Sequence, residues 1–160
     1  MQTRHHGVRL FAALLAGALS ISVAWPVAAA APQGVTIVSD VTFVEGGSNI
    51  GSFTTSGDAA DSGAICPAGS FEDTGIRFAG GPARTGIVQL QVFKTFTCDD
   101  DSGTFDVKMQ IQANFDTGIE TFTWVITGGS GDYASFHGGG SGSSVPRPGG
   151  NTNTYVGMVH

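Results

Sequence analysis

Positive charge is scarce in this sequence, and the scarcity excludes two classes of partner. The chain has seven Lys and Arg against thirteen Asp and Glu, for a formal net charge of −6 at pH 7. A phosphate backbone is bound by clustered Lys and Arg that release its counterions, and an anionic lipid surface also attracts basic clusters. We therefore expect neither a nucleic acid nor a membrane surface as partner.

Long apolar runs are lacking after the first thirty residues. Two arginines precede the apolar run Leu10–Trp25, Pro26 breaks it, and the small residues Ala28–Ala30 follow. This order is typical of a signal peptide, and the run is shorter than the roughly 20 apolar residues that span a bilayer. The sequence predicts a signal peptide over residues 1–30 and one secreted domain over residues 31–160, with no membrane anchor.

Cysteine is nearly absent, with Cys66 and Cys98 as the two examples. In an oxidising compartment a lone pair is most simply a disulfide, and this one would close a loop of about 33 residues, worth about 3–4 kcal/mol. A metal site or a nucleophilic thiol would need partner ligands or a base, and residues 31–160 offer His137 and His160 alone among histidines. We predict a structural disulfide and neither metal nor cofactor.

Strong helix-forming residues are few, whereas glycine is abundant at 25 of 160 residues. Such a composition disfavours long helices and suits short strands joined by tight turns. Charged residues are also few, at 12%, but the spaced runs of Val, Ile and Phe argue against disorder. The class expected is all-β.

Alternation of apolar and polar residues locates the strands. Phe105–Phe115 alternates strictly over its whole length, the pattern of a strand with one buried face. In Ile87–Cys98 the even positions form an apolar face on which Lys94 is the exception, and Pro67 argues for an edge or a bulge. The other expected strands are Val35–Val44, Ile50–Thr55, Ile119–Thr127, Tyr155–Val159 and, more weakly, Ile65–Phe71 and Gly75–Phe78.

Short connections between these strands predict an antiparallel meander. Gly57–Ala64 reads as a loop, and Asp99–Gly103 and Asp116–Gly118 read as turns. Strands this long curl strongly, and closure into a barrel removes the exposed edges. We predict an antiparallel eight-stranded β-barrel, with a two-sheet β-sandwich as the alternative.

The segment from Thr127 to Gly142 reads TGGSGDYASFHGGGSG. We expect a sharp reversal at Gly128–Gly131, then a short turn at Asp132–His137 in which Tyr133 and Phe136 both face the core. The spacing matches neither of the common phosphate-binding glycine motifs, and no Lys follows. The residues that form the pattern are Gly128, Gly129, Gly131, Tyr133, Gly138 and Gly140.

This pattern resembles the allene oxide cyclase and dirigent-like barrel group, and the likeness covers Gly86–His160. The resemblance implies an eight-stranded antiparallel barrel, of the calycin kind, that acts as a cyclase, as a stereochemical guide for radical coupling, or as a pocket without assigned activity. Glu45 is the one acid near the place where a plant cyclase carries its functional glutamate, but its flanking residues do not match. No catalytic residue is carried over.

Two further groups invite a chemical interpretation. Asp99–Asp101 could bind calcium, but the spacing does not match the EF-hand pattern. A solvated hairpin turn accounts for this run of acidic residues. His137 lies near Ser135, but no nucleophile elbow surrounds the serine and no third, orienting group is evident. The catalytic residues are therefore unknown from sequence.

Three functions follow from these observations. The first is a non-catalytic extracellular barrel that binds a small apolar ligand in its interior. Phe105, Met109, Ile111 and Trp124 are the candidate lining residues, with ordinary core packing as the favoured alternative for them. The second is a cofactor-free cyclase or isomerase in which Glu45 is buried in the cavity. The third is a protein-interaction module with a filled barrel and an exposed apolar patch. The sequence indicates neither the ligand nor the oligomeric state.

Overall fold

The computed structural model describes residues 31–80, 86–114 and 117–160. The predicted signal peptide, residues 1–30, lies outside the described residues, as do Phe115 and Asp116 of the predicted strand and turn.

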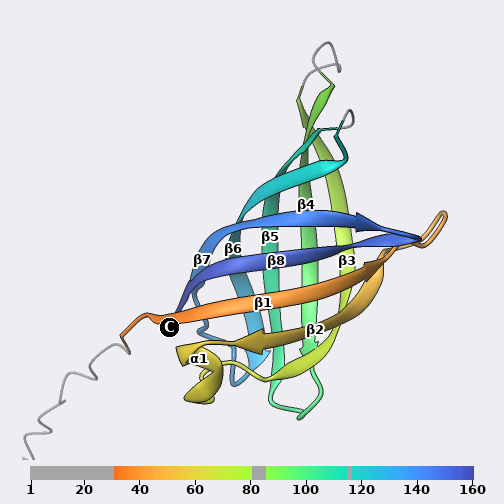
Figure 1. The fold of residues 1–160 in the computed structure, drawn as a ribbon. Coiled ribbons are helices and arrows are strands. Elements are labelled where there is room, and N and C mark those ends of the chain that lie inside the picture. The colour runs from red at the N-terminus through yellow and green to blue at the C-terminus, as the bar shows by residue number, and fades with distance from the viewer. Residues whose placement is uncertain (1–30, 81–85, 115–116) are drawn as a thin grey trace, which may run out of the picture.

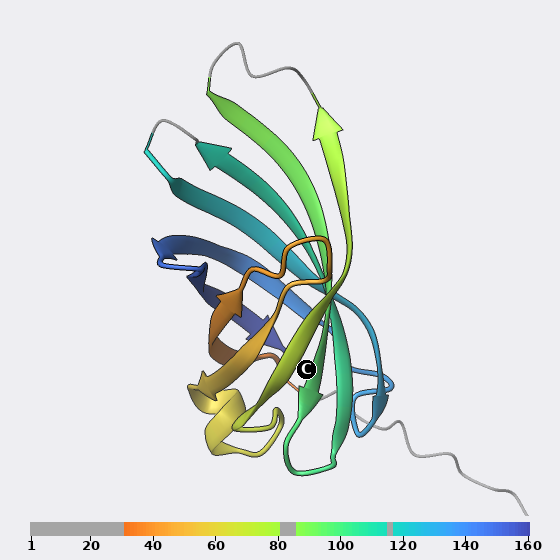
Figure 2. The same ribbon diagram turned by 90° about the vertical axis from the view of Figure 1, so that its right-hand side faces the viewer.

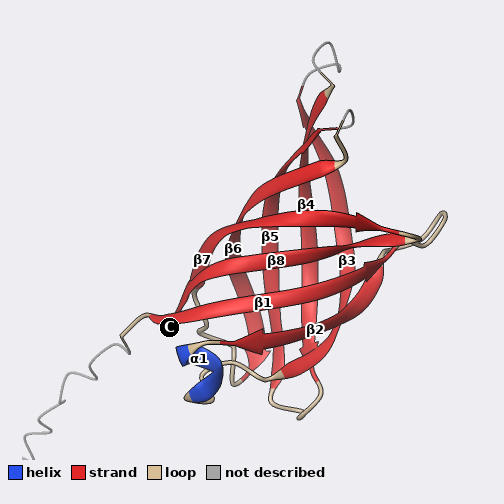
Figure 3. Cartoon of the chain, viewed as in Figure 1, coloured by secondary structure: helices blue, strands red, loops and turns tan. Residues whose placement is uncertain are grey.

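Eight antiparallel strands form a closed barrel in which each strand pairs with its neighbours in the sequence and β1 pairs with β8 (Figure 1). Figure 3 shows the all-β character of the described chain. The closed barrel confirms the predicted eight-stranded β-barrel and excludes the alternative two-sheet sandwich. The strands are β1 (Gln33–Thr42), β2 (Ile50–Ser56), β3 (Ala68–Gly80), β4 (Ile87–Cys98), β5 (Gly103–Asn114), β6 (Ile119–Gly131), β7 (Gly138–Arg147) and β8 (Gly150–Val159).

Three predicted details were wrong, each for a local reason. The loop Gly57–Ala64 contains a short helix, α1 (Asp58–Asp61). The two weak strands around residue 70 are one strand, β3, because a bulge at Thr74 absorbs the break in alternation. Gly128–Gly131 does not reverse the chain: β6 continues through a bulge to Gly131.

One end of the barrel is closed and filled. α1 lies against β1 and β2, where Ala59 is fully buried, and the turn after β6 buries both Tyr133 and Phe136, as predicted. Phe96 is the centre of the packing there, with its ring stacked on Phe105 at 4.9 Å between centroids and edge-on to Phe53 at 5.1 Å. Aromatic pairs in these geometries add to the free energy gained by burial.

Glycines on the inner faces of β7 and β8 make room for this aromatic core. A Cβ atom at Gly142 would lie 2.4 Å from the Phe122 ring, and one at Gly157 would lie 2.7 Å from Trp124. Both distances are impossible for real atoms. Close packing of large rings against a neighbouring backbone therefore explains glycine at these two positions.

The predicted disulfide joins Cys66, just before β3, to Cys98 at the end of β4, with 5.9 Å between their Cα atoms. Both cysteines are buried, so alanine is the matched replacement. We expect the Cys66→Ala/Cys98→Ala variant to lose about 3 kcal/mol of unfolding free energy, because the unfolded chain is no longer cross-linked. Urea unfolding of the variant and of the oxidised wild type measures the loss; a difference below about 1 kcal/mol would contradict this role.

A candidate ligand site at the open end of the barrel

The end opposite α1 is open. Strands β3 to β6 contain 12 or 13 residues each, whereas β1, β2, β7 and β8 contain 10 or fewer. The longer strands therefore project beyond the shorter ones as a curved wall (Figure 2). Residues on the inner face of this wall are not covered by the opposite side of the barrel.

The bulge in β3 decides which side chains face this opening. Gly75 pairs with Phe93 on the outer face, so Ile76 and Phe78 pair with Val92 and Leu90 on the inner face. Without the extra residue the alternation would turn Gly75 and Arg77 inward instead. Ile76 is 51% exposed and Phe78 is 81% exposed although both face inward, so the mouth of the barrel is apolar and accessible.

A buried ion pair lies below this apolar mouth. Asp73 and Lys94 are direct cross-strand partners on the inner faces of β3 and β4, and the Lys94 Nζ donates to Asp73 Oδ1. Only 5% of Asp73 and 3% of Lys94 is exposed. Asn49 Nδ2 donates to Asp73 Oδ2 at 2.9 Å, and the Lys94 Nζ lies 4.5 Å from the centre of the Phe71 ring.

Burial and the neighbouring Asp73 carboxylate shift the pKa of Lys94 in opposite directions. Burial lowers the pKa of the Lys94 ammonium below that of an ordinary lysine, because the charged form loses its hydration, while the Asp73 carboxylate offsets part of that effect. A buried charge of this kind is retained where a partner and further hydrogen bonds compensate it. The pair is therefore a neutral unit in the wall of the barrel.

A polar row faces the pair from the other half of the barrel. Glu120 on β6 pairs with Ser144 on β7, Ser144 pairs with Asn153 on β8, and Asn153 pairs with Ser39 on β1. Cross-strand partners share a face of the sheet, and Ser39 lies two residues from each of the buried core residues Ile37 and Val41. All four side chains therefore lie on the inner face. The row and the ion pair together make the interior polar at this level.

Two groups of the polar region have altered pKa values. Partial burial raises the pKa of the Glu120 carboxyl, while the Ser144 hydroxyl and the charge of Lys94 lower it in part. Complete burial raises the pKa of the Tyr155 phenol, which donates to the Met109 sulfur at 3.4 Å. Tyr155 therefore remains neutral. Among the residues that the structure describes, Glu120 has no salt-bridge partner, whereas Asp73 has Lys94.

One cavity of about 120 Å³ is lined by the ion pair, by Glu120 and Asn153 of the polar row, and by Ile76 and Leu90 at the apolar mouth. Its polar lining comprises Asn49, Asp73, Lys94, Glu120, Asn151 and Asn153, and its apolar lining comprises Val41, Phe43, Ile76, Leu90, Val92, Met109 and Ile111. A cavity with an apolar wall and a few convergent polar groups is the usual form of a small-molecule site.

The predicted ligand-lining residues separate into three groups. Met109 and Ile111 line the cavity, whereas Phe105 and Trp124 are buried in the filled half and pack against aromatic neighbours. Glu45 is exposed in the connection between β1 and β2, so the prediction that it faces the interior was wrong. A loop acid has no strand alternation to direct it inward.

The other residues singled out in the sequence lie away from this cavity. Asp100 accepts hydrogen bonds from the backbone and the hydroxyl of Ser102, as in a hairpin turn. His137 and His160 are exposed, bond to each other through their backbones, and hold their rings 5.9 Å apart. Within the described ranges, no group of three or more His, Cys, Asp or Glu could hold a metal ion.

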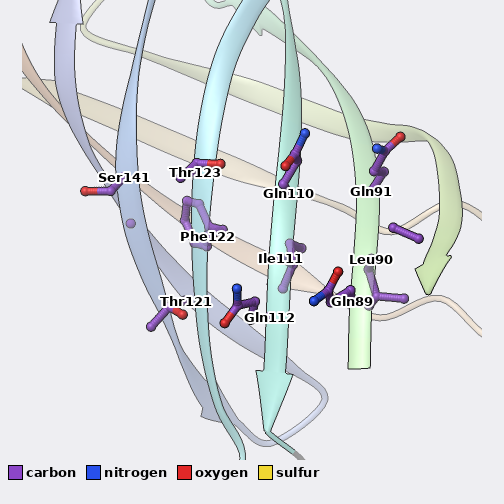
Figure 4. Close-up of a pocket in the computed structure, with 12 residues that line it drawn as sticks. Gln89, Leu90, Gln91, Gln110, Ile111, Gln112, Thr121, Phe122, Thr123 and Ser141 are labelled. Carbon is purple, nitrogen blue, oxygen red and sulfur yellow. The ribbon is translucent and has the colours of Figure 1, made fainter. Parts of the chain in front are cut away.

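A second hollow, of about 540 Å³, crosses the outer face of β4 to β7 (Figure 4). The register places Gln91, Gln110, Thr123 and Ser141 in one cross-strand row, and Gln89, Gln112 and Thr121 in the next. The hollow runs between these two rows of outward side chains. Its polar side chains are uncharged and most of them are exposed, so we do not assign it a ligand.

Comparison with protein families, with curated proteins and with solved structures finds no match to this chain.

Proposed function

We propose that this protein is a secreted carrier that binds one small molecule with an apolar body in the open half of its barrel. The observation that carries the proposal is the contrast between the two halves. One half is packed with aromatic rings, whereas in the other Ile76 and Phe78 face inward and are exposed above a polar floor. Exposed inward-facing apolar residues are covered when a ligand enters.

The size of the cavity limits the ligand. A dry cavity of about 150 Å³ accommodates benzene, and the volume here is about 120 Å³. The enclosed part therefore takes a group of a few heavy atoms. The remainder of the ligand lies against the apolar mouth formed by Ile76, Phe78 and Leu90.

Secretion belongs to the same proposal. The disulfide accords with an oxidising compartment, and no helix in the described part of the chain is long and apolar enough to cross a bilayer. The predicted signal peptide would direct the barrel to that compartment.

A cofactor-free cyclase or isomerase is the second candidate, and Glu120 is the observation that favours it. This carboxyl lines the cavity and its pKa is raised by partial burial, which suits a general acid. Glu120 replaces Glu45 in that hypothesis, because Glu45 is exposed. The resemblance to the allene oxide cyclase and dirigent-like group remains a prediction from sequence.

Titration with phenethyl alcohol, a neutral molecule with one phenyl ring, tests the carrier proposal. We expect saturable shifts of the methyl resonances of Val92, Leu90 and Ile111, with a Kd of about 1 mM or lower. The Leu90→Trp variant places a large ring in the mouth and should abolish the shifts. Val125→Trp is the matched control, because Val125 lies exposed on the outer face, and it should leave them unchanged.

Two results would contradict the proposal. One is the absence of saturable shifts with phenethyl alcohol and with larger aromatic alcohols. The other is a set of shifts that persists in Leu90→Trp, which would place binding outside the barrel. Enzymatic turnover of a bound ligand, lost in Glu120→Gln with binding retained, would favour the second candidate.

A further inference from the structure

We propose that the cavity selects a ligand whose apolar body ends in a primary ammonium group, which is bound by Glu120 and the amide oxygen of Asn153. This inference rests on the proposed carrier function and names the chemical class of its ligand. Three observations on the cavity lining lead to it.

The first observation is the balance of charge. Three charged side chains line the cavity: Asp73, Lys94 and Glu120. Asp73 and Lys94 neutralise each other through a direct hydrogen bond. Glu120 has no salt-bridge partner among the described residues. Its carboxylate leaves the cavity lining with a net negative charge in a partly buried place, where electrostatic interactions are stronger than in water. A cation complements this site, whereas an anion is repelled by it.

The second observation is an excess of hydrogen-bond acceptors. Asn153 is 4% exposed, and its Oδ1 has no hydrogen-bond partner among the described residues. Asn151 also lines the cavity, and its Oδ1 likewise has no hydrogen-bond partner among them. The Asn153 Nδ2 is already directed to the Tyr155 hydroxyl, at 3.5 Å. A buried acceptor without a donor is costly, so the ligand that fits must bring donors.

The third observation is the common location of these acceptors. Glu120 and Asn153 are both register partners of Ser144, one on each side of β7, so they flank the same point of the inner wall. A primary ammonium carries three donors and a positive charge. It can therefore bind the Glu120 carboxylate and the Asn153 amide oxygen together, while an alcohol offers a single donor and no charge.

The apolar mouth completes the recognition. The ammonium group occupies the polar floor, and the hydrocarbon part extends toward Ile76 and Phe78 at the open end. Titratable or charged groups that face Glu120 across the cavity are Lys94 on β4 and Asp73 on β3; its register partners on β5 and β7, Ala113 and Ser144, carry no charge. Glu120 is therefore the group whose ionisation governs ammonium binding.

Isothermal titration with three ligands of matched shape tests this inference. Phenethylamine, phenethyl alcohol and hydrocinnamate share the phenyl ring and differ in the charge of the other end. At neutral pH we expect phenethylamine to bind at least about tenfold more tightly than phenethyl alcohol, because charge-assisted hydrogen bonds are the stronger class. Hydrocinnamate should bind more weakly than the alcohol.

Substitution of Glu120 tests whether this residue causes the preference for the amine over the alcohol. Glu120→Gln keeps the size of the side chain and should reduce the preference for the amine to about twofold or less. Glu72→Gln is the matched control: Glu72 is exposed on the outer face, next to Asp73 in the sequence, and its loss should not alter the preference. A thermal unfolding midpoint close to that of the wild type shows that Glu120→Gln is folded.

Dependence on pH gives an independent readout. Because partial burial raises the pKa of Glu120, its carboxylate is neutralised as the pH falls through that raised value, while the amine stays charged. The preference for phenethylamine should therefore decline toward unity at acid pH in the wild type and stay flat in Glu120→Gln.

The outcomes separate the two proposals. Binding of all three ligands with equal affinity would overturn the ammonium inference and leave the carrier function standing. A preference for the amine that survives in Glu120→Gln would also overturn it. Failure of all three ligands to bind would remove the carrier function itself.

Discussion

We expect the substitution Lys94→Met to lower the free energy of unfolding by about 3–5 kcal/mol, because it leaves Asp73 as a buried charge without its partner. Methionine occupies a similar volume, so little of the loss comes from packing. Asp73 is 5% exposed and would keep only the Asn49 amide as a side-chain donor. Urea unfolding at neutral pH measures the change.

The double variant Lys94→Met/Asp73→Leu distinguishes two effects on the free energy of unfolding: the loss caused by an unpaired buried charge, and the contribution of the intact ion pair. Replacement of both ions by apolar residues is often neutral or stabilising, so the double variant should recover most of the stability lost by Lys94→Met. Lys108→Met is the control, because Lys108 is the partly exposed outward lysine of β5, and we expect a change within about 0.5 kcal/mol. A double variant as unstable as Lys94→Met would show that the pair itself stabilises the barrel.

A pair of truncations should distinguish the filled half of the barrel from the open half. Phe96 is fully buried and contacts four aromatic rings, those of Phe53, Phe71, Phe105 and Tyr155. We expect Phe96→Ala to cost about 3–5 kcal/mol, the range for a large residue removed from a packed core. Leu90 is only partly buried at the mouth, so Leu90→Ala should cost about 1 kcal/mol.

Thermal and urea unfolding of both variants provide the comparison. Val88→Ala, a smaller truncation on the same inner face of β4, is a useful control because Val88 is also partly exposed, and we expect it to cost no more than Leu90→Ala. Equal losses for Phe96→Ala and Leu90→Ala would mean that the two halves are packed alike. The carrier function would then lose its main support.

The architecture could be predicted because alternation along the strands is a local signal. The pattern of Phe105–Phe115 identifies a strand with one buried face, and short connections force neighbouring strands to pair. What the pattern did not predict is the effect of bulges. One extra residue at Thr74 turns Ile76 and Phe78 to the inner face, and neither the propensity nor the spacing of those residues indicates which side they take.

The candidate site was only partly visible in the sequence. Lys94 breaks the apolar face of its strand, and this was the signal of an inward charge; its partner Asp73 was missed because β3 was divided into two weaker strands. Phe122 and Trp124 are even positions of β6 that face inward. Continuing this alternation by one step toward the N-terminus would have predicted that Glu120 also faces inward. The row from Glu120 to Ser39 could not, because it depends on the register of four strands.

Native mass spectrometry of the protein purified from its own host is the most direct test of the central claim, that the open half of the barrel holds a small molecule. We predict a reproducible extra mass that disappears on denaturation, is absent from the Leu90→Trp variant, and belongs to a compound with an apolar body. A bare mass, together with no uptake of phenethyl alcohol or phenethylamine by the native protein, would contradict the account.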